Sequence, residues 1–249
     1  MTTLRDRLID RAVKLGIDDQ LRTIRDSLPT PARHRNRLAD LSLRLLLSFT
    51  LAENANCIDV GVYRGKVLAE MVRVAPHGKH IAYEPQPGKY KELVERFPTV
   101  DIRQTALSNQ NGEATFNLVK NIQGYSGLRE VSYPREAQIE KLTVRTEKLD
   151  DSLPEGYIPT LIKIDVEGAE GLVLEGALKT ITQHKPIIVF EHGKAAAEHY
   201  DTGPRRIYEL LHNEVGLRIF DMDGNGPYSL AEFEDTCARD ERWDYVAHL

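Results

Sequence analysis

The chain has 249 residues, of which 41% are hydrophobic and 29% charged, an ordinary composition for a soluble globular protein. This length allows one large α/β domain with an added segment. The net charge of −5 argues against a broad basic surface, so neither nucleic acid nor anionic lipid is an expected partner. The two cysteines, Cys57 and Cys237, form neither a metal-ligand spacing nor a disulfide framework, which favours a reducing compartment.

Hydropathy excludes a membrane-spanning segment, because no run approaches the ~18 apolar residues that a span requires. The opening residues, MTTLRDRLIDRAVKLG, include acids and lack the apolar core of a signal peptide. We therefore expect a cytoplasmic protein without a membrane span.

Residues 1–55 are predicted to form an N-terminal helical segment. Apolar residues have helical spacing over residues 4–28, and after a break of two prolines at 29–31 a second helix is predicted over 33–51. Residues 56–249 contain no linker-like stretch, so we expect them to form one domain.

From residue 57 onward, strand and helix patterns alternate. Strands are predicted at 57–60, 80–84, 100–105, 160–165 and 187–191, and helices at 67–74, 89–96 and 172–181. Such alternation gives right-handed crossovers and a mostly parallel sheet with helices on both faces. Two final strands, at 217–221 and 245–248, complete a doubly wound α/β fold with a seven-stranded sheet.

A long insertion, residues 109–156, separates the third and fourth parallel strands. An Asn-Gly turn and two alternating segments, 114–119 and 142–149, predict an antiparallel hairpin. The loop at 121–133 contains Tyr125 and Ser126 and is glycine-hinged, as active-site lids often are. An ordinary exposed connection is the alternative.

The first predicted strand ends in the turn DVGVYRG, residues 59–65. Its glycines let the backbone approach a ligand closely, and the amides of the helix that follows favour a carboxylate. The Gly-x-Gly-x-x-Gly pattern of a pyrophosphate site is absent. An acid before the glycines suits a cofactor with a positively charged amino-acid tail, such as S-adenosylmethionine. A simple strand-to-helix turn is the alternative.

Glu84 ends the next strand, and Pro85 restricts the loop after it. A carboxylate at this place can accept hydrogen bonds from both hydroxyls of a ribose. We expect Asp59 and Glu84 to lie at neighbouring strand tips and to bind the cofactor together.

Four stretches together resemble the FkbM family of S-adenosylmethionine-dependent methyltransferases: IAYEPQPGKYKEL, ALSNQNGEATF, YSGL and LIKIDVEGAEGLVLEGA. The resemblance covers about residues 56–249, and KIDVEGAE is its most specific piece. It implies a class I methyltransferase fold, with strand order 3-2-1-4-5-7-6, and usually methylation of a hydroxyl oxygen. The family commonly has Ala-Asn after Asp-Val-Gly, whereas this chain has Val62 and Tyr63. This departure alters the wall near the methionine end of the cofactor.

The catalytic candidates follow the fourth and fifth strands: Asp165, Glu191 and His192. Methyl transfer from a sulfonium is an in-line displacement, and an alcohol acceptor benefits from a general base or a metal-bound alkoxide. Capping of the next helix is the alternative role for Asp165. Adjacent strand residues point to opposite faces, so we expect only one of Glu191 and His192 to face the cleft, and the pattern leaves open which.

The predicted function is transfer of a methyl group to a hydroxyl of a sugar, glycolipid or natural product. The expected cofactor residues are Asp59, Gly61, Tyr63, Gly65, Glu84, Pro85 and Ala106, and the expected acceptor residues are Tyr125, Ser126 and Glu167. No metal ligand is assigned, while a divalent metal and a homo-oligomer stay open. The alternatives are a nucleotide-dependent oxidoreductase on a similar sheet and a non-catalytic binding module.

Residues 221–232 match every ligand position of an EF-hand calcium loop. A strand pattern precedes the loop where an EF-hand has a helix, and Tyr228 occupies a position that is usually aliphatic. We interpret the segment as a glycine-rich turn before a short helix at 230–238.

Overall fold

The computed structural model describes residues 31–249 except 123, 132, 134–135, 194–197, 201 and 241, with side chains from residue 37 onward. The chain divides into two compact units between Leu43 and Arg44. Helix α3, Pro31–Thr50, crosses this division and confirms the helix predicted at 33–51. The helix predicted at 4–28 lies outside the described residues. In the part of the chain with a described structure, no helix is long and apolar enough to cross a membrane.

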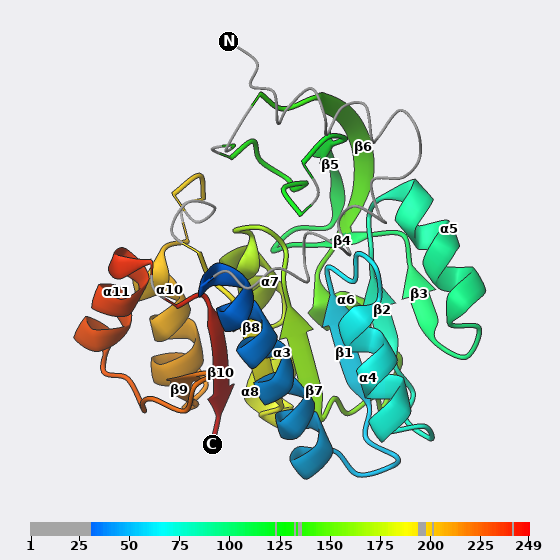
Figure 1. The fold of residues 1–249 in the computed structure, drawn as a ribbon. Coiled ribbons are helices and arrows are strands. Elements are labelled where there is room, and N and C mark those ends of the chain that lie inside the picture. The colour runs from blue at the N-terminus through cyan, green and yellow to red at the C-terminus, as the bar shows by residue number, and fades with distance from the viewer. Residues whose placement is uncertain are drawn as a thin grey trace. The chain divides into compact units, whose positions relative to one another are not determined.

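The second unit is built on a seven-stranded sheet with the order β3-β2-β1-β7-β8-β10-β9 (Figure 1). Its strands are β1 (Cys57–Val60), β2 (Ile81–Tyr83), β3 (Asp101–Arg103), β7 (Leu161–Ile164), β8 (Ile187–Glu191), β9 (Arg218–Asp221) and β10 (Asp244–His248). All neighbours are parallel except β10, which is antiparallel to both β8 and β9. Counted in chain order these seven strands have the predicted order 3-2-1-4-5-7-6, which confirms the predicted fold class.

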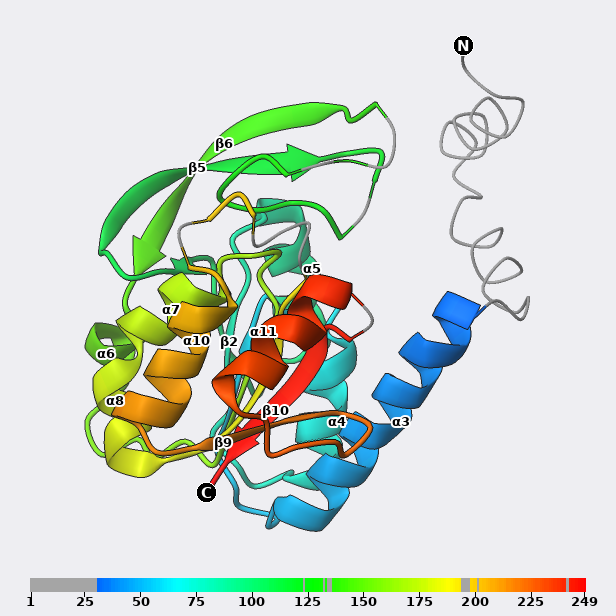
Figure 2. The ribbon, with the colours of Figure 1, turned by 90° about the vertical axis from the view of Figure 1, so that its left-hand side faces the viewer.

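Helices cover both faces of this sheet, and Figure 2 shows α7, α8 and α10 on one face and α4 on the other. The helices are α4 (Lys66–Val74), α5 (Pro87–Arg96), α6 (Leu149–Ser152), α7 (Glu170–Gly176), α8 (Leu178–His184), α10 (Pro204–Tyr208), which continues as a π-helical turn over Glu209–Glu214, and α11 (Leu230–Arg239). Because both faces are covered, the two central strands β1 and β7 are apolar throughout except at Asp59 and Lys163.

The prediction of one helix at 172–181 was wrong, since the chain leaves helical geometry at Ala177, with φ −113° and ψ 3°. Val173, Leu174, Ala177 and Ile181 are all buried in the same core. The apolar spacing therefore continues across the break, and periodicity alone does not reveal it.

The insertion forms a second sheet of three strands in the order β4-β6-β5, with β4 at Ala106–Leu107, β5 at Gly112–Val119 and β6 at Ile139–Glu147. Strands β5 and β6 pair antiparallel along their length, which confirms the predicted hairpin. Strand β4 pairs with β6 in parallel and, at two residues, is too short to predict. Both ribbon views place this sheet beyond the carboxyl ends of the parallel strands (Figures 1 and 2).

Candidate active site

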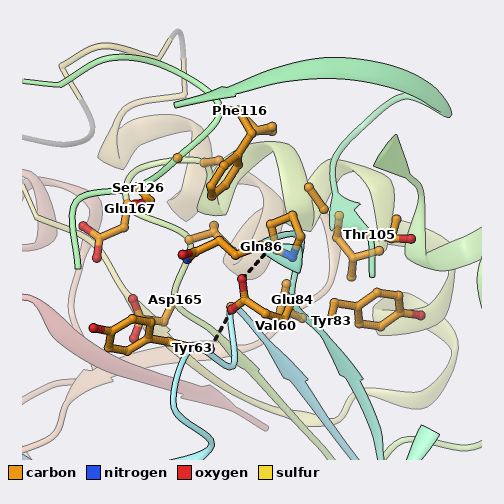
Figure 3. Close-up of a pocket in the computed structure, with 18 of the residues that line it drawn as sticks. Val60, Tyr63, Tyr83, Glu84, Gln86, Thr105, Phe116, Ser126, Asp165 and Glu167 are labelled. Carbon is orange, nitrogen blue, oxygen red and sulfur yellow. Dashed lines mark hydrogen bonds between the residues drawn. The ribbon is translucent and has the colours of Figure 1, made fainter. Parts of the chain in front are cut away.

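A pocket lies where the parallel strands end, and the second sheet forms its roof (Figure 3). Its empty volume is about 890 Å³, which includes the open mouth. The predicted site residues that line it are Gly61, Tyr63, Glu84, Pro85, Ala106, Ser126, Asp165, Glu167 and Glu191. The pocket thus brings together residues from β1, β2, β7, β8 and the insertion.

The turn after β1 is held in its conformation by the protein's own packing. Gly61 has φ +81°, and a Cβ placed on it would lie 1.8 Å from the carbonyl oxygen of Asp165. Gly65 has φ +69° at the N-cap of α4, and its Cβ would lie 2.6 Å from the ring of Phe97. Both positions therefore require glycine. Tyr63, between them, also has a positive φ of 50°, which is uncommon for a residue with a side chain.

Glu84 is buried at the tip of β2, and its carboxylate is bound on both oxygens. Oε2 accepts a hydrogen bond from the amide of Tyr63 at 2.7 Å, and Oε1 accepts one from the amide of Gln86 at 2.9 Å (Figure 3). Burial raises the pKa of Glu84 to about 7, against the lowering effect of these amides. Each oxygen accepts one backbone amide and has a second lone pair for a ligand in the pocket.

Asp59 lies beneath the pocket rather than among its described lining residues. Its side chain is 1% exposed, and neither carboxylate oxygen has a hydrogen bond of good geometry, although the Leu68 amide in α4 approaches it. Burial raises the pKa of Asp59 to about 6, while the charge of Lys163 lowers it. The negative charge of Asp59 acts on Glu84, whose pKa it raises further.

The opposite wall carries the motif KIDVEGAE. Asp165 follows β7, and its Oδ2 accepts a hydrogen bond from Lys163 Nζ at 2.7 Å. Asp165 does not cap the next helix, because α7 has Ala169 at its N-cap and no side-chain capping bond. Glu170 Oε1 instead accepts hydrogen bonds from the loop amides of Val166 and Gly168. These bonds shape the loop that presents Asp165 to the pocket.

Glu167 has φ +56°, a conformation that costs about 1 kcal/mol or more for a residue with a Cβ. Its side chain lines the pocket, and burial, with the charges of Asp165 and Glu170, raises its pKa to about 9. The raised pKa favours the neutral acid form of Glu167, which can donate a hydrogen bond.

The side chains of Glu191 and His192 diverge, and Glu191 is the one that lines the pocket. Burial, together with Asp165, Glu167 and Asp244, raises its pKa well above the ordinary value. His192 is 1% exposed, with Nδ1 3.8 Å from Glu170 Oε2 and its ring stacked near Phe233. It lines a separate cavity beside α11.

The insertion supplies the apolar roof of the pocket through Phe116 and Leu128. Ser126 also lines the pocket, and its hydroxyl accepts a hydrogen bond from the amide of Val119. Tyr125 lies outside the described lining. Burial raises the pKa of its hydroxyl most, and the charges of Glu167 and Glu191 raise it further. Arg129 ties the loop to the chain after β8, because its amide donates to the hydroxyl of Tyr200 at 3.0 Å.

Several residues in and beneath the pocket were not predicted from the sequence, above all Lys163, Gln86, Phe116 and Leu128. A lysine inside an otherwise apolar strand, two residues before a strand-end aspartate, was the available signal for Lys163. For Phe116 and Leu128, the only signal in the sequence was the alternation of apolar and polar residues in the insertion. Across the described residues, no group of three His, Cys, Asp or Glu side chains is arranged to hold a metal ion.

The EF-hand-like loop uses its polar residues to build a turn. Asp221 is buried, and its carboxylate accepts hydrogen bonds from the amides of Asp223 and Asn225 and from the hydroxyl of Tyr228. Ser229 and Glu232 form a capping box at the start of α11. This arrangement agrees with our interpretation of a turn before a short helix.

The strand order, the glycine turn after β1 and the acid at the tip of β2 define a class I methyltransferase fold. The chain belongs to the FkbM methyltransferase family, whose domain model (Methyltransferase FkbM domain) matches residues 59–218. The comparison with curated proteins gave no match.

One solved structure supports the fold. The crystal structure of an FkbM methyltransferase from Methylobacillus flagellatus is similar over 80% of this chain with 16% identity and a TM-score of 0.51. This chain spans only 44% of the length of that protein. A TehB-like S-adenosylmethionine-dependent methyltransferase from Corynebacterium glutamicum is similar over 87% of this chain and 93% of its own, with 12% identity and a TM-score of 0.44.

Proposed function

We propose that this protein is an S-adenosylmethionine-dependent methyltransferase that methylates a hydroxyl group of a sugar, glycolipid or natural product. One observation carries the proposal. The buried Glu84 carboxylate and the glycine turn after β1 share a pocket with Asp165, on a chain of the FkbM family.

The residues present fit the cofactor. The Glu84 carboxylate is held rigidly by two amides and has lone pairs left for both ribose hydroxyls. The Gly61–Gly65 turn leads to the N-terminus of α4, whose amides favour the carboxylate of the methionine end. Ala106, which also lines the pocket, would lie against the adenine. When bound, this cofactor supplies a methyl group activated by a sulfonium.

Asp165 is the residue that we assign as general base. It lies on the pocket wall across from Glu84, and its carboxylate would take the proton of the acceptor hydroxyl as the new C–O bond forms. Glu191 is the second candidate, but its raised pKa makes it a weaker choice at neutral pH. His192 faces a different cavity, so we assign it a structural role.

The rest of the pocket would select and orient the acceptor. Glu167 as a neutral acid can donate a hydrogen bond to an acceptor oxygen, and Ser126 offers a further polar group beside it. Phe116 and Leu128 present an apolar roof that can pack on a sugar ring or an acyl chain and exclude water. This mixture of apolar and hydroxyl-binding groups favours an alcohol acceptor.

The test is a mass-spectrometric screen. The purified protein is incubated with S-adenosylmethionine and extracts or pure alcohols from the native host, and products are searched for the mass gain of one CH₂ group. We expect a methylated alcohol that Asp165→Asn no longer forms. Methylation of nitrogen acceptors alone would contradict the assignment of hydroxyl as the target.

A further inference from the structure

Lys163 is a lysine inside a strand that is otherwise buried and apolar. Its side chain is 11% exposed, and its Cα is the register partner of Asp59 on β1 and of Val189 on β8. Side chains of paired residues in parallel strands lie on the same face, so Lys163 and Asp59 are neighbours beneath the pocket.

The Lys163 ammonium also reaches the pocket wall. Residues two apart on a strand share a face, and Lys163 Nζ donates to Asp165 Oδ2 at 2.7 Å. Glu191 lies on that face at the end of β8, two residues after Val189. Lys163 therefore lies among three carboxylates, from Asp59, Asp165 and Glu191.

The pocket has no other cation of its own within the described lining, which includes four carboxylates: Glu84, Asp165, Glu167 and Glu191. Burial would lower the pKa of Lys163, but Asp165 and Asp59 raise it above the ordinary value, so the ammonium keeps its charge. A buried cation that is hydrogen-bonded to one carboxylate fixes the position of that carboxylate.

We propose that Lys163 is a positioning residue for methyl transfer: it binds one oxygen of Asp165 and so presents the other to the acceptor hydroxyl. This inference rests on the proposed function. In the step itself the acceptor O–H bond breaks, its proton passes to Asp165, the methyl group moves from sulfur to oxygen, and the sulfonium becomes a thioether. Lys163 keeps its own proton throughout.

The kinetic test compares K163M, which has no donor, with K163Q, which keeps a neutral donor. With the alcohol found in the screen, we expect kcat to fall about 100-fold in K163M and about 10-fold in K163Q, within the range of base catalysis. The acceptor KM should change less than about threefold, because Lys163 does not line the pocket. The acidic limb of the pH–rate profile should move to higher pH in K163M. Lys141→Met, on exposed strand β6, is the control and should leave kcat unchanged.

A second test needs no acceptor. Crystal structures of wild type, K163M and K163Q with S-adenosylhomocysteine should show the Asp165 carboxylate turned away only in K163M. If K163M does not fold, K163Q decides through kcat, which should still fall about 10-fold. An Asp165 carboxylate that stays in place in K163M, or a kcat that is unchanged in both variants, would overturn the role of Lys163. If wild type methylates no alcohol, the proposed function fails, and the crystal structures still decide whether Lys163 positions Asp165.

Discussion

Gly61 and Asp165 pack backbone against backbone, so that a Cβ on Gly61 would lie 1.8 Å from the Asp165 carbonyl oxygen. The Asp165 amide also donates a hydrogen bond, 3.0 Å long, to the carbonyl of Val60, the residue before Gly61. The turn assigned to the cofactor and the carboxylate assigned to catalysis are therefore parts of one rigid unit at the edge of the sheet.

Gly61→Ala should separate these two strand ends. The added methyl group meets backbone, which cannot rotate away, and the residue also has φ +81°. We expect a loss of about 3 kcal/mol or more in the free energy of unfolding, measured by urea denaturation. Gly88→Ala in α5 is the matched control, since a Cβ there meets nothing within 4 Å. The control should be neutral or stabilising by up to about 1 kcal/mol.

Glu84→Gln should weaken binding of S-adenosylhomocysteine about 30-fold in calorimetry, since charge-assisted bonds to the ribose are lost. In addition, Glu84 now accepts hydrogen bonds from two backbone amides. The side-chain amide nitrogen of glutamine would face one of these amides, and two N–H donors cannot form a hydrogen bond with each other. Glu113→Gln on the exposed edge of β5 is the control and should bind like wild type. Equal affinity in the two variants would remove Glu84 from the cofactor site.

The same carboxylate predicts a pH dependence. Its pKa is raised from 4.5 to about 7 in the folded protein without ligand, so it must lose a proton before it can accept both hydroxyls. Affinity for S-adenosylhomocysteine should therefore fall as the pH drops below about 7, by at most about tenfold per pH unit, and Glu84→Gln should lack this dependence. For the unliganded fold the sign is opposite, because a raised pKa gives stability at low pH that is lost as the pH rises through about 7.

Tyr200→Phe should loosen the roof of the pocket. The change removes the hydroxyl that accepts from the Arg129 amide, while the ring that packs under the Arg129 guanidinium stays. One lost hydrogen bond of about 1 kcal/mol corresponds to roughly fivefold faster amide exchange, here over residues 127–129. Tyr90→Phe in α5 is the control. Exchange that is unchanged in both variants would show that this bond does not hold the loop.

Asp221→Asn tests the calcium-like loop. The buried carboxylate accepts four hydrogen bonds, including those from the Asn225 side chain and the Tyr228 hydroxyl, so the amide should cost about 1–3 kcal/mol of stability. Asp223→Asn, at a side chain 42% exposed, should change stability by less than about 1 kcal/mol. Wild type should show no calorimetric heat with millimolar calcium, and a saturable heat that Asp221→Asn abolishes would contradict the turn role.

Much of the fold could be predicted because its signals are local. The central strands are apolar and end at acids or glycines, and the closing antiparallel pair fixes the strand order. The break at Ala177 escaped prediction because a continuous apolar spacing crosses it. The two residues of β4 are paired only through tertiary contact with β6, which no local pattern reports.

The sequence predicted which residues of the site lie at strand ends, but not where their side chains point or what they contact. Glu84 and Asp165 follow from their places after buried strands, whereas the choice between Glu191 and His192 depends on strand twist and on what packs behind each side chain. A role for Lys163 could be predicted only from the register between β1 and β7, which pairs Lys163 with Asp59. Register is set by long-range pairing, so one sequence gives it no clear signature.

A crystal structure of the wild-type protein with S-adenosylhomocysteine tests the assigned cofactor site most directly. We expect both ribose hydroxyls to bind the Glu84 carboxylate and the sulfur to face the wall that carries Asp165. Binding of the ligand at another place would contradict this assignment. So would a pocket that stays empty after both soaking and co-crystallisation with millimolar S-adenosylhomocysteine.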